Sequence, residues 1–98
     1  MGPSSSMMKD ADFAEQALKM MLHGITESMQ HAVVLVERRD RAGAVAMIAV
    51  VTGTAQLVEK MLEDAFMHHE ERWYMEARTN ANAVRAAVED IHNTIRGC

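Results

Sequence analysis

The sequence from Ala42 to Ala65, AGAVAMIAVVTGTAQLVEKMLEDA, decides the fold. Its apolar residues recur at alternating steps of four and three, the spacing that places side chains on one face of a helix. This face resembles the seam of a coiled coil, and it consists of Ala44, Ile48, Val51, Ala55, Val58, Leu62 and Ala65. We therefore predict a helix that buries this seam against another helix.

The rest of the chain is equally poor in residues that break helices. Proline does not occur after Pro3, and only three glycines lie between Asp10 and Arg96. Folds built from strands and turns collect both residue types at their corners, so the chain of 98 residues is predicted to be all-α. Its hydrophobic content of 49% suits one globular domain, which we place at residues 9–98. Residues 1–8 are predicted to be a disordered tail left by an expression vector.

A first helix is predicted from about residue 10 to residue 39. Asp12 and Glu15 have the spacing of a capping box, with aspartate in place of serine or threonine. The apolar positions that follow also recur at helical spacing, and they are Ala14, Leu18, Met21, Leu22, Ile25, Met29, Ala32, Val33 and Val36. Gly43 is predicted to be the turn residue just after this helix.

After Gly43 the sequence favours one continuous helix from about residue 44 to residue 95. No Gly, Pro, Ser, Thr, Asp or Asn lies between Ala65 and Arg78 to cap a new helix. The apolar phase also continues across this region, through Leu62, Phe66, His69 and Trp73. The prediction is an elongated antiparallel helical hairpin. The alternative is a break in the polar segment 67–72, which would give a three-helix bundle.

A second stripe on the same helix consists of small residues, namely Ala42, Ala46, Ala49 and Gly53. Glycine lowers helix propensity, so its presence favours close approach of another backbone over a choice made for propensity alone. The stripe and the seam lie on different faces, and one chain offers a single partner helix. We therefore predict a homodimer, with an interface drawn from the small stripe and from Ile48, Val51, Val58 and Leu62.

Three of the four aromatic residues lie within ten positions of one another, which indicates a contact surface. Trp and Tyr are enriched at interface hot spots, and methionine suits adaptable binding surfaces. The candidate surface for a partner protein consists of Phe66, Met67, Trp73, Tyr74 and Met75. On a continuous helix Trp73 would follow the buried stripe, and Tyr74 would point to solvent.

The histidines raise the possibility of a metal site. Glu89 and His92 have the Glu-x-x-His spacing of di-iron helical bundles. Two carboxylate–imidazole pairs four residues apart, Glu27 with His31 and Asp64 with His68, could bind a metal or simply hydrogen-bond, and Met67, His68 and His69 form a further group. A di-iron site needs several carboxylates that converge in a core, so we predict helix-surface pairs and no metal or cofactor. His69 follows the apolar phase and is predicted to face a neighbouring helix, unlike His68.

Charge and cysteine content narrow the function classes. A net charge of −4 without a basic stripe argues against nucleic-acid binding. The uncharged run 42–58 is short for a membrane span and is predicted to be a buried helix. Cys98 is the only cysteine, which favours a reduced, cytoplasmic protein. No nucleophile motif or glycine-rich phosphate loop is present, so we do not expect an enzyme.

The leading hypothesis is a helical protein–protein interaction module that acts as a homodimer. An adaptor, a chaperone, an inhibitor or an assembly subunit would all fit this description, and the partners would be a second copy and another protein. The alternative hypothesis is a metal-binding, di-iron-like helical bundle, in which Glu89 and His92 would supply ligands.

Overall fold

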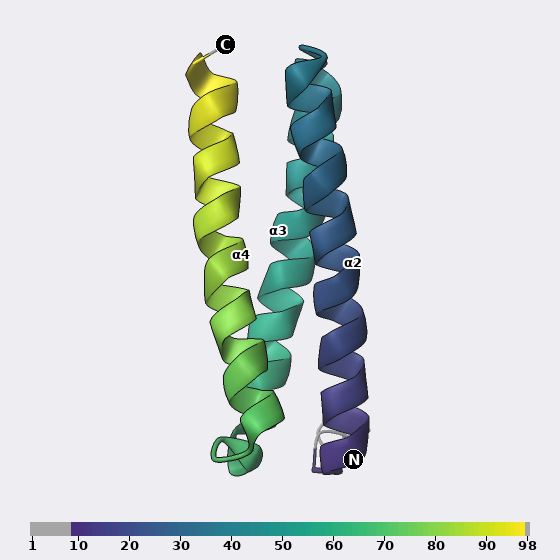
Figure 1. The fold of residues 1–98 in the computed structure, drawn as a ribbon, viewed down its shortest axis with the longest axis vertical. Coiled ribbons are helices and arrows are strands. Elements are labelled where there is room, and N and C mark those ends of the chain that lie inside the picture. The colour runs from purple at the N-terminus through teal and green to yellow at the C-terminus, as the bar shows by residue number, and fades with distance from the viewer. Residues whose placement is uncertain (1–8, 98) are drawn as a thin grey trace.

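Three helices and one short 3-10 helix make up the part of the chain that the computed structural model describes, residues 9–97. They are α2 (Ala11–Glu37), α3 (Arg41–Asp64), η1 (Phe66–His68) and α4 (Arg72–Gly97). α3 runs antiparallel to α2 and α4 and packs against both, so α2 and α4 point in the same direction (Figure 1). Residues 9–97 contain no strand, and the all-α prediction is confirmed. The predicted tail 1–8 lies outside the described residues.

The predicted continuous helix from 44 to 95 is wrong, because α3 ends at Asp64 and α4 folds back from Arg72. The turn between them satisfies its own backbone: the amide of His68 donates to the carbonyl of Ala65 at 2.9 Å, and that of Glu71 to His68 at 2.9 Å. A single long helix would extend beyond α2 and leave half of its apolar stripe in water. Folding back instead buries Ala65, Tyr74, Ala77 and Ala81 in the core of one chain. This burial stabilises the chain more than an unbroken helix would.

Aspartates begin both of the first two helices. The Oδ1 atom of Asp10 accepts from the amide of Asp12 at 3.0 Å, so Asp10 is the N-cap of α2 and Asp12 is not. Asp40 caps α3 by accepting from the amide of Gly43 at 2.9 Å. α3 therefore begins at Arg41, three residues earlier than predicted. Gly43 lies in its first turn and does not form the turn between the helices.

The turn after α2 is instead made by Arg39, whose φ of 60° is the one positive φ among residues 9–97. The amide of Asp40 donates to the carbonyl of Leu35 at 2.9 Å, and that of Arg39 to Val36 at 3.0 Å. These two bonds form a Schellman motif, which usually has glycine at the left-handed position. Arginine carries a Cβ there, and the left-handed conformation costs roughly 1 kcal/mol for a residue with a Cβ.

Replacing Arg39 by glycine should therefore stabilise the protein by about 0.5–1 kcal/mol, because the left-handed strain disappears while the Schellman bonds remain. Urea unfolding followed by circular dichroism measures the change. Arg38→Gly is the matched control, because Arg38 has a φ of −82° and gains nothing from glycine. Equal effects at the two positions would contradict the interpretation.

The seam that decides the fold is buried as predicted, apart from the half-buried Ala55. Ala44, Ile48, Val51 and Val58 are each exposed by 1% or less. They face α2 and α4, and Ile48 joins Ala32 of α2 and Ile95 of α4 in one core cluster. The opposite side of α3 is therefore turned away from both neighbouring helices.

Candidate functional site

The side of α3 that faces away from α2 and α4 is apolar and uncovered. Its residues are exposed and carry no charge, and we call them the α3 outer face: Ala42, Val45, Ala46, Ala49, Val50, Gly53 and Leu57. Val50 is 59% exposed and Leu57 is 50% exposed. Scattered single apolar residues are normal on a protein surface, but a continuous strip over four helical turns is typical of an interaction site.

The structure separates the two halves of the predicted interface. Ile48, Val51, Val58 and Leu62 lie in the core of the single chain, whereas the four small residues lie on the α3 outer face. A Cβ atom added at Gly53 would meet nothing within 4 Å. The close helix crossing predicted at Gly53 is therefore not made within residues 9–97.

By length and composition alone, α3 could also cross a membrane. Its most apolar 18-residue stretch has a mean hydropathy of 1.5, and 22% of that stretch is buried inside the chain. The prediction that the run 42–58 is a buried helix is therefore correct for its seam only. Its seam is buried, and its outer face is not.

The aromatic cluster has a different arrangement from the predicted one. Tyr74 is 3% exposed, so the prediction that it points to solvent is wrong. Trp73 is half-buried and packs against the core, so its predicted burial is only partial. The break between α3 and α4 resets the helical phase, which explains why Tyr74 is buried. Phe66, Met67 and Met75 are all more than half exposed, so these three remain available as a partner surface at the turn.

Tyr74 links the two helices that the turn connects. Its hydroxyl donates to the carbonyl of Leu62 at 3.0 Å, within the last turn of α3. The ring lies edge-on to Phe66, with 6.4 Å between centroids, and to Trp73, with 6.0 Å. Arg78 approaches the same hydroxyl at 3.4 Å. Tyr74 thus satisfies a carbonyl at the end of α3 while it packs the start of α4 onto that end.

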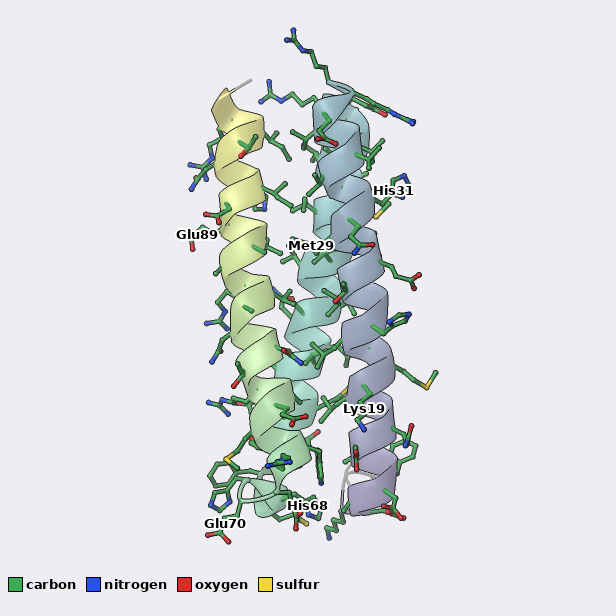
Figure 2. The ribbon with its side chains drawn as sticks, in the orientation of Figure 1. Lys19, Met29, His31, His68, Glu70 and Glu89 are labelled. Atoms are coloured by element: carbon green, nitrogen blue, oxygen red, sulfur yellow. The ribbon has the colours of Figure 1, made fainter. Side chains whose placement is uncertain are left out.

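A long groove between α2 and α4 was not predicted from the sequence. It has a volume of about 780 Å³. It is lined by one face of each helix, from Glu15 to Val33 on α2 and from Trp73 to Ile91 on α4. Met29 points into the space between the two helices (Figure 2). The only hint in the sequence is a run of small residues on α4, including Ala83 and Ala87, which leave room beside the helix.

The charged groups along this α2/α4 groove are mostly acidic. Glu15, Glu76 and Asp90 line it together with one lysine, Lys19. The Glu15 carboxylate accepts a hydrogen bond from Nζ of Lys19 at 2.6 Å. This bond and the charge of Glu15 raise the pKa of Lys19 above its usual value, and the charge of Glu76 on α4 adds to the effect. The ammonium of Lys19 is therefore already partnered, and an acidic excess remains along the groove.

The two neighbouring histidines of the turn are anchored in different ways. Nδ1 of His69 lies 2.9 Å from the carbonyl of Phe66, and its ring stacks on the Phe66 ring with 4.5 Å between centroids. His69 is exposed, so the prediction that it faces a neighbouring helix is wrong. Nε2 of His68 instead reaches the carbonyl of Lys9 at 3.0 Å, just before α2.

The carboxylates and histidines considered as metal ligands do not converge. Nε2 of His23 lies 3.4 Å from the Glu27 carboxylate, whereas His31 and Glu89 point away from the bundle on opposite sides (Figure 2). Asp64 is paired with Lys60 at 3.8 Å. Between residues 9 and 97, no three His, Cys, Asp or Glu side chains come together in a group that could hold a metal ion.

Residues 9–97 form an all-α three-helix bundle with an uncovered apolar face on α3 and an open groove between α2 and α4. Comparison of the chain with known protein families, with curated proteins and with solved structures finds no match.

Proposed function

We propose that the chain is a helical protein–protein interaction module that acts as a homodimer, in which two copies meet through the α3 outer face. The observation that carries this proposal is the uncovered, uncharged surface from Ala42 to Leu57. Burial of apolar surface is the main favourable term in protein association. An adaptor or an assembly subunit that dimerises through this face would keep its other surfaces free for a partner.

The chemistry of the α3 outer face favours a second copy as its occupant. A contact across a two-fold axis places the same surface on both sides, so any charge near the axis would meet its own copy. The face has none between residues 42 and 58. Its small residues alternate with Val45, Val50 and Leu57, so the larger side chains of one copy can insert beside the alanines of the other.

The area that a stable dimer needs indicates how far the contact extends. Standard interfaces bury about 800 Å² on each partner, whereas the uncharged strip of α3 is only about 25 Å long at 1.5 Å per residue. The remaining area would come from α2, which packs alongside α3. Phe13 and Met20 of α2 are 42% and 73% exposed, and they are the side chains that would enlarge the contact.

The test is a matched pair of alanine-to-glutamate substitutions. Wild-type protein at micromolar concentration should sediment at twice the chain mass of 10.9 kDa. Ala49→Glu would place an unpaired charge in the interface and should weaken the dimer about tenfold or more, while circular dichroism shows unchanged helix content. Ala86→Glu, on the exposed surface of α4, should leave the dimer intact.

Two results would contradict the proposal. One is a wild-type protein that sediments as a compact monomer. The other is an Ala49→Glu variant that dimerises as the wild type does. Co-sedimentation of monomers with phosphatidylcholine and phosphatidylglycerol vesicles, abolished by Ala49→Glu, would instead assign the α3 outer face to a membrane surface.

A further inference from the structure

The α2/α4 groove is long enough to hold another helix. Both helices that line it run in the same direction, with α3 behind them (Figure 1). On each helix the first and last lining residues are eighteen positions apart, from Glu15 to Val33 and from Trp73 to Ile91, which corresponds to about 27 Å at 1.5 Å per residue. A fourth helix of five turns laid in this groove would complete a four-helix bundle.

The lining of the groove suits an apolar helix face. Val33 and Met29 of α2 and Trp73, Val84 and Ile91 of α4 offer partly or fully exposed apolar surface along its length, above the buried Leu18 and Leu22. On the α4 side the lining includes three small residues, Ala77, Ala83 and Ala87, which leave space for a neighbouring backbone. Helices that pack through small residues approach more closely than the usual 8–10 Å between axes, so the backbone of a bound helix could lie near α4.

The charges along the groove select among possible helices. Glu15, Glu76 and Asp90 are opposed only by Lys19, which leaves a net charge of −2 when His23 is neutral. His23 itself is directed to Glu27 at 3.4 Å. The carboxylates of Glu76 and Asp90 form no ion pair within 4.0 Å among residues 9–97. They lie fourteen positions apart, or four turns of α4, near the two ends of the groove.

We infer that the α2/α4 groove binds an amphipathic helix of another protein, with an apolar stripe about five turns long and a Lys or Arg near each end of that stripe. Two basic residues fourteen positions apart would lie opposite Glu76 and Asp90. Binding of an amphipathic helix in an apolar groove is a common mode of recognition, and complementary charge sets its specificity. A second copy fits less well, because the basic residues at the two ends of the α3 outer face, Arg41 and Lys60, lie nineteen positions apart instead of fourteen, and Lys60 is already paired with Asp64 at 3.8 Å.

This inference rests on the proposed role as an interaction module, but it does not depend on the dimer. The groove is lined by α2 and α4 alone, and the proposed dimer contact centres on the opposite side of α3. An Ala49→Glu variant that no longer dimerises should bind the helix as well as the wild type does. Failure of the dimer and failure of the groove proposal are therefore separate results.

Trp73, the only tryptophan, lines the groove and provides the signal. The probe is a capped synthetic peptide of eighteen residues built from Leu, Ala and Gln, with leucines at alternating steps of three and four and two lysines fourteen positions apart. The control peptide has glutamates in place of both lysines. We expect the lysine peptide to shift the emission of Trp73 and to bind about five- to tenfold more tightly than the glutamate peptide.

Two pairs of variants locate the binding site. Ala83→Phe fills the groove and should weaken binding of the lysine peptide about tenfold or more, because it blocks the approach of the helix. Ala86→Phe is the matched control, since Ala86 is exposed outside the groove, and it should bind as the wild type does. The charge-reversed double variant Glu76→Lys with Asp90→Lys should instead prefer the glutamate peptide.

Three results would overturn the inference. Equal affinity for the two peptides would show general apolar adhesion without the predicted charge selection. Absence of binding to the lysine peptide at millimolar concentration would exclude a basic helix as the occupant. Conversion of the dimer to a monomer by Ala83→Phe, but not by Ala49→Glu, would show that the groove holds a second copy of the chain.

Discussion

Truncation of Tyr74 to alanine should lower the free energy of unfolding by about 3–5 kcal/mol, the range for removing a large aromatic side chain from a core. Tyr74 is 3% exposed and belongs to the larger of the two core clusters. Its ring packs between the end of α3 and the start of α4, so the cavity would open at the turn that folds α4 back. Urea unfolding monitored by circular dichroism measures the loss.

Two control variants divide this effect. Tyr74→Phe removes only the hydroxyl that donates to the carbonyl of Leu62 at 3.0 Å, and it should cost about 1–2 kcal/mol. Phe66→Ala removes a neighbouring ring that is 57% exposed, so it should cost less than Tyr74→Ala. A Tyr74→Ala variant within about 1 kcal/mol of the wild type would contradict the proposed role of this side chain, because such a loss is typical of a surface position.

The helical fold could be predicted because its signals are local. The seam from Ala44 to Ala65 repeats with one period over its whole length, and this period is enough to identify a helix and its buried face. The aspartates at the helix starts are equally local signals. The signal of Asp40 is obscured by Gly43, because a glycine at this spacing is typical of a helix end, whereas here Gly43 is the residue whose amide Asp40 caps.

The turn between α3 and α4 could be predicted only as the alternative, a break in the segment 67–72, because its cause is tertiary. No residue from 65 to 78 breaks a helix by its own propensity. The helix ends because folding back buries Tyr74 and Ala77 against the rest of the bundle, a gain that depends on residues far away in the sequence. The polar segment 67–72 is the one local sign of the turn, and the apolar phase that continues through His69 and Trp73 favours an unbroken helix instead.

Of the two candidate surfaces, one could be predicted from the sequence and the other could not. The small residues of the α3 outer face belong to one helix, so their common direction follows from the sequence. The α2/α4 groove depends on how far apart two helices lie once α3 has packed against both. Neither Glu76 nor Asp90 belongs to a motif that would indicate a groove, and only the arrangement of the helices brings them to its edge.

Replacing Gly24 and Gly53 together by alanine should stabilise the fold by about 2 kcal/mol. Glycine inside a helix costs about 0.8–1.0 kcal/mol relative to alanine, and a Cβ at either position would meet nothing within 4 Å. For a chain of this size, each kcal/mol raises Tm by about 4–8 °C, so a gain of about 8–16 °C is expected. The two glycine substitutions are also measured in an Ala49→Glu background, so that a change in dimerisation does not contribute to the shift in Tm.

Gly43→Ala is the matched control, because it makes the same chemical change in the first turn of α3. A Cβ there would lie 2.6 Å from Oδ2 of Asp40, the carboxylate whose other oxygen accepts from the Gly43 amide. Relief of this clash would move the cap, at a cost of about 0.5–2 kcal/mol, which offsets the gain in propensity. Thermal unfolding should therefore rank the double variant well above the wild type and leave Gly43→Ala near or below it. An equal gain at all three glycines would show that the Asp40 cap contributes nothing, and a loss at Gly24 would show that the outer side of α2 is covered.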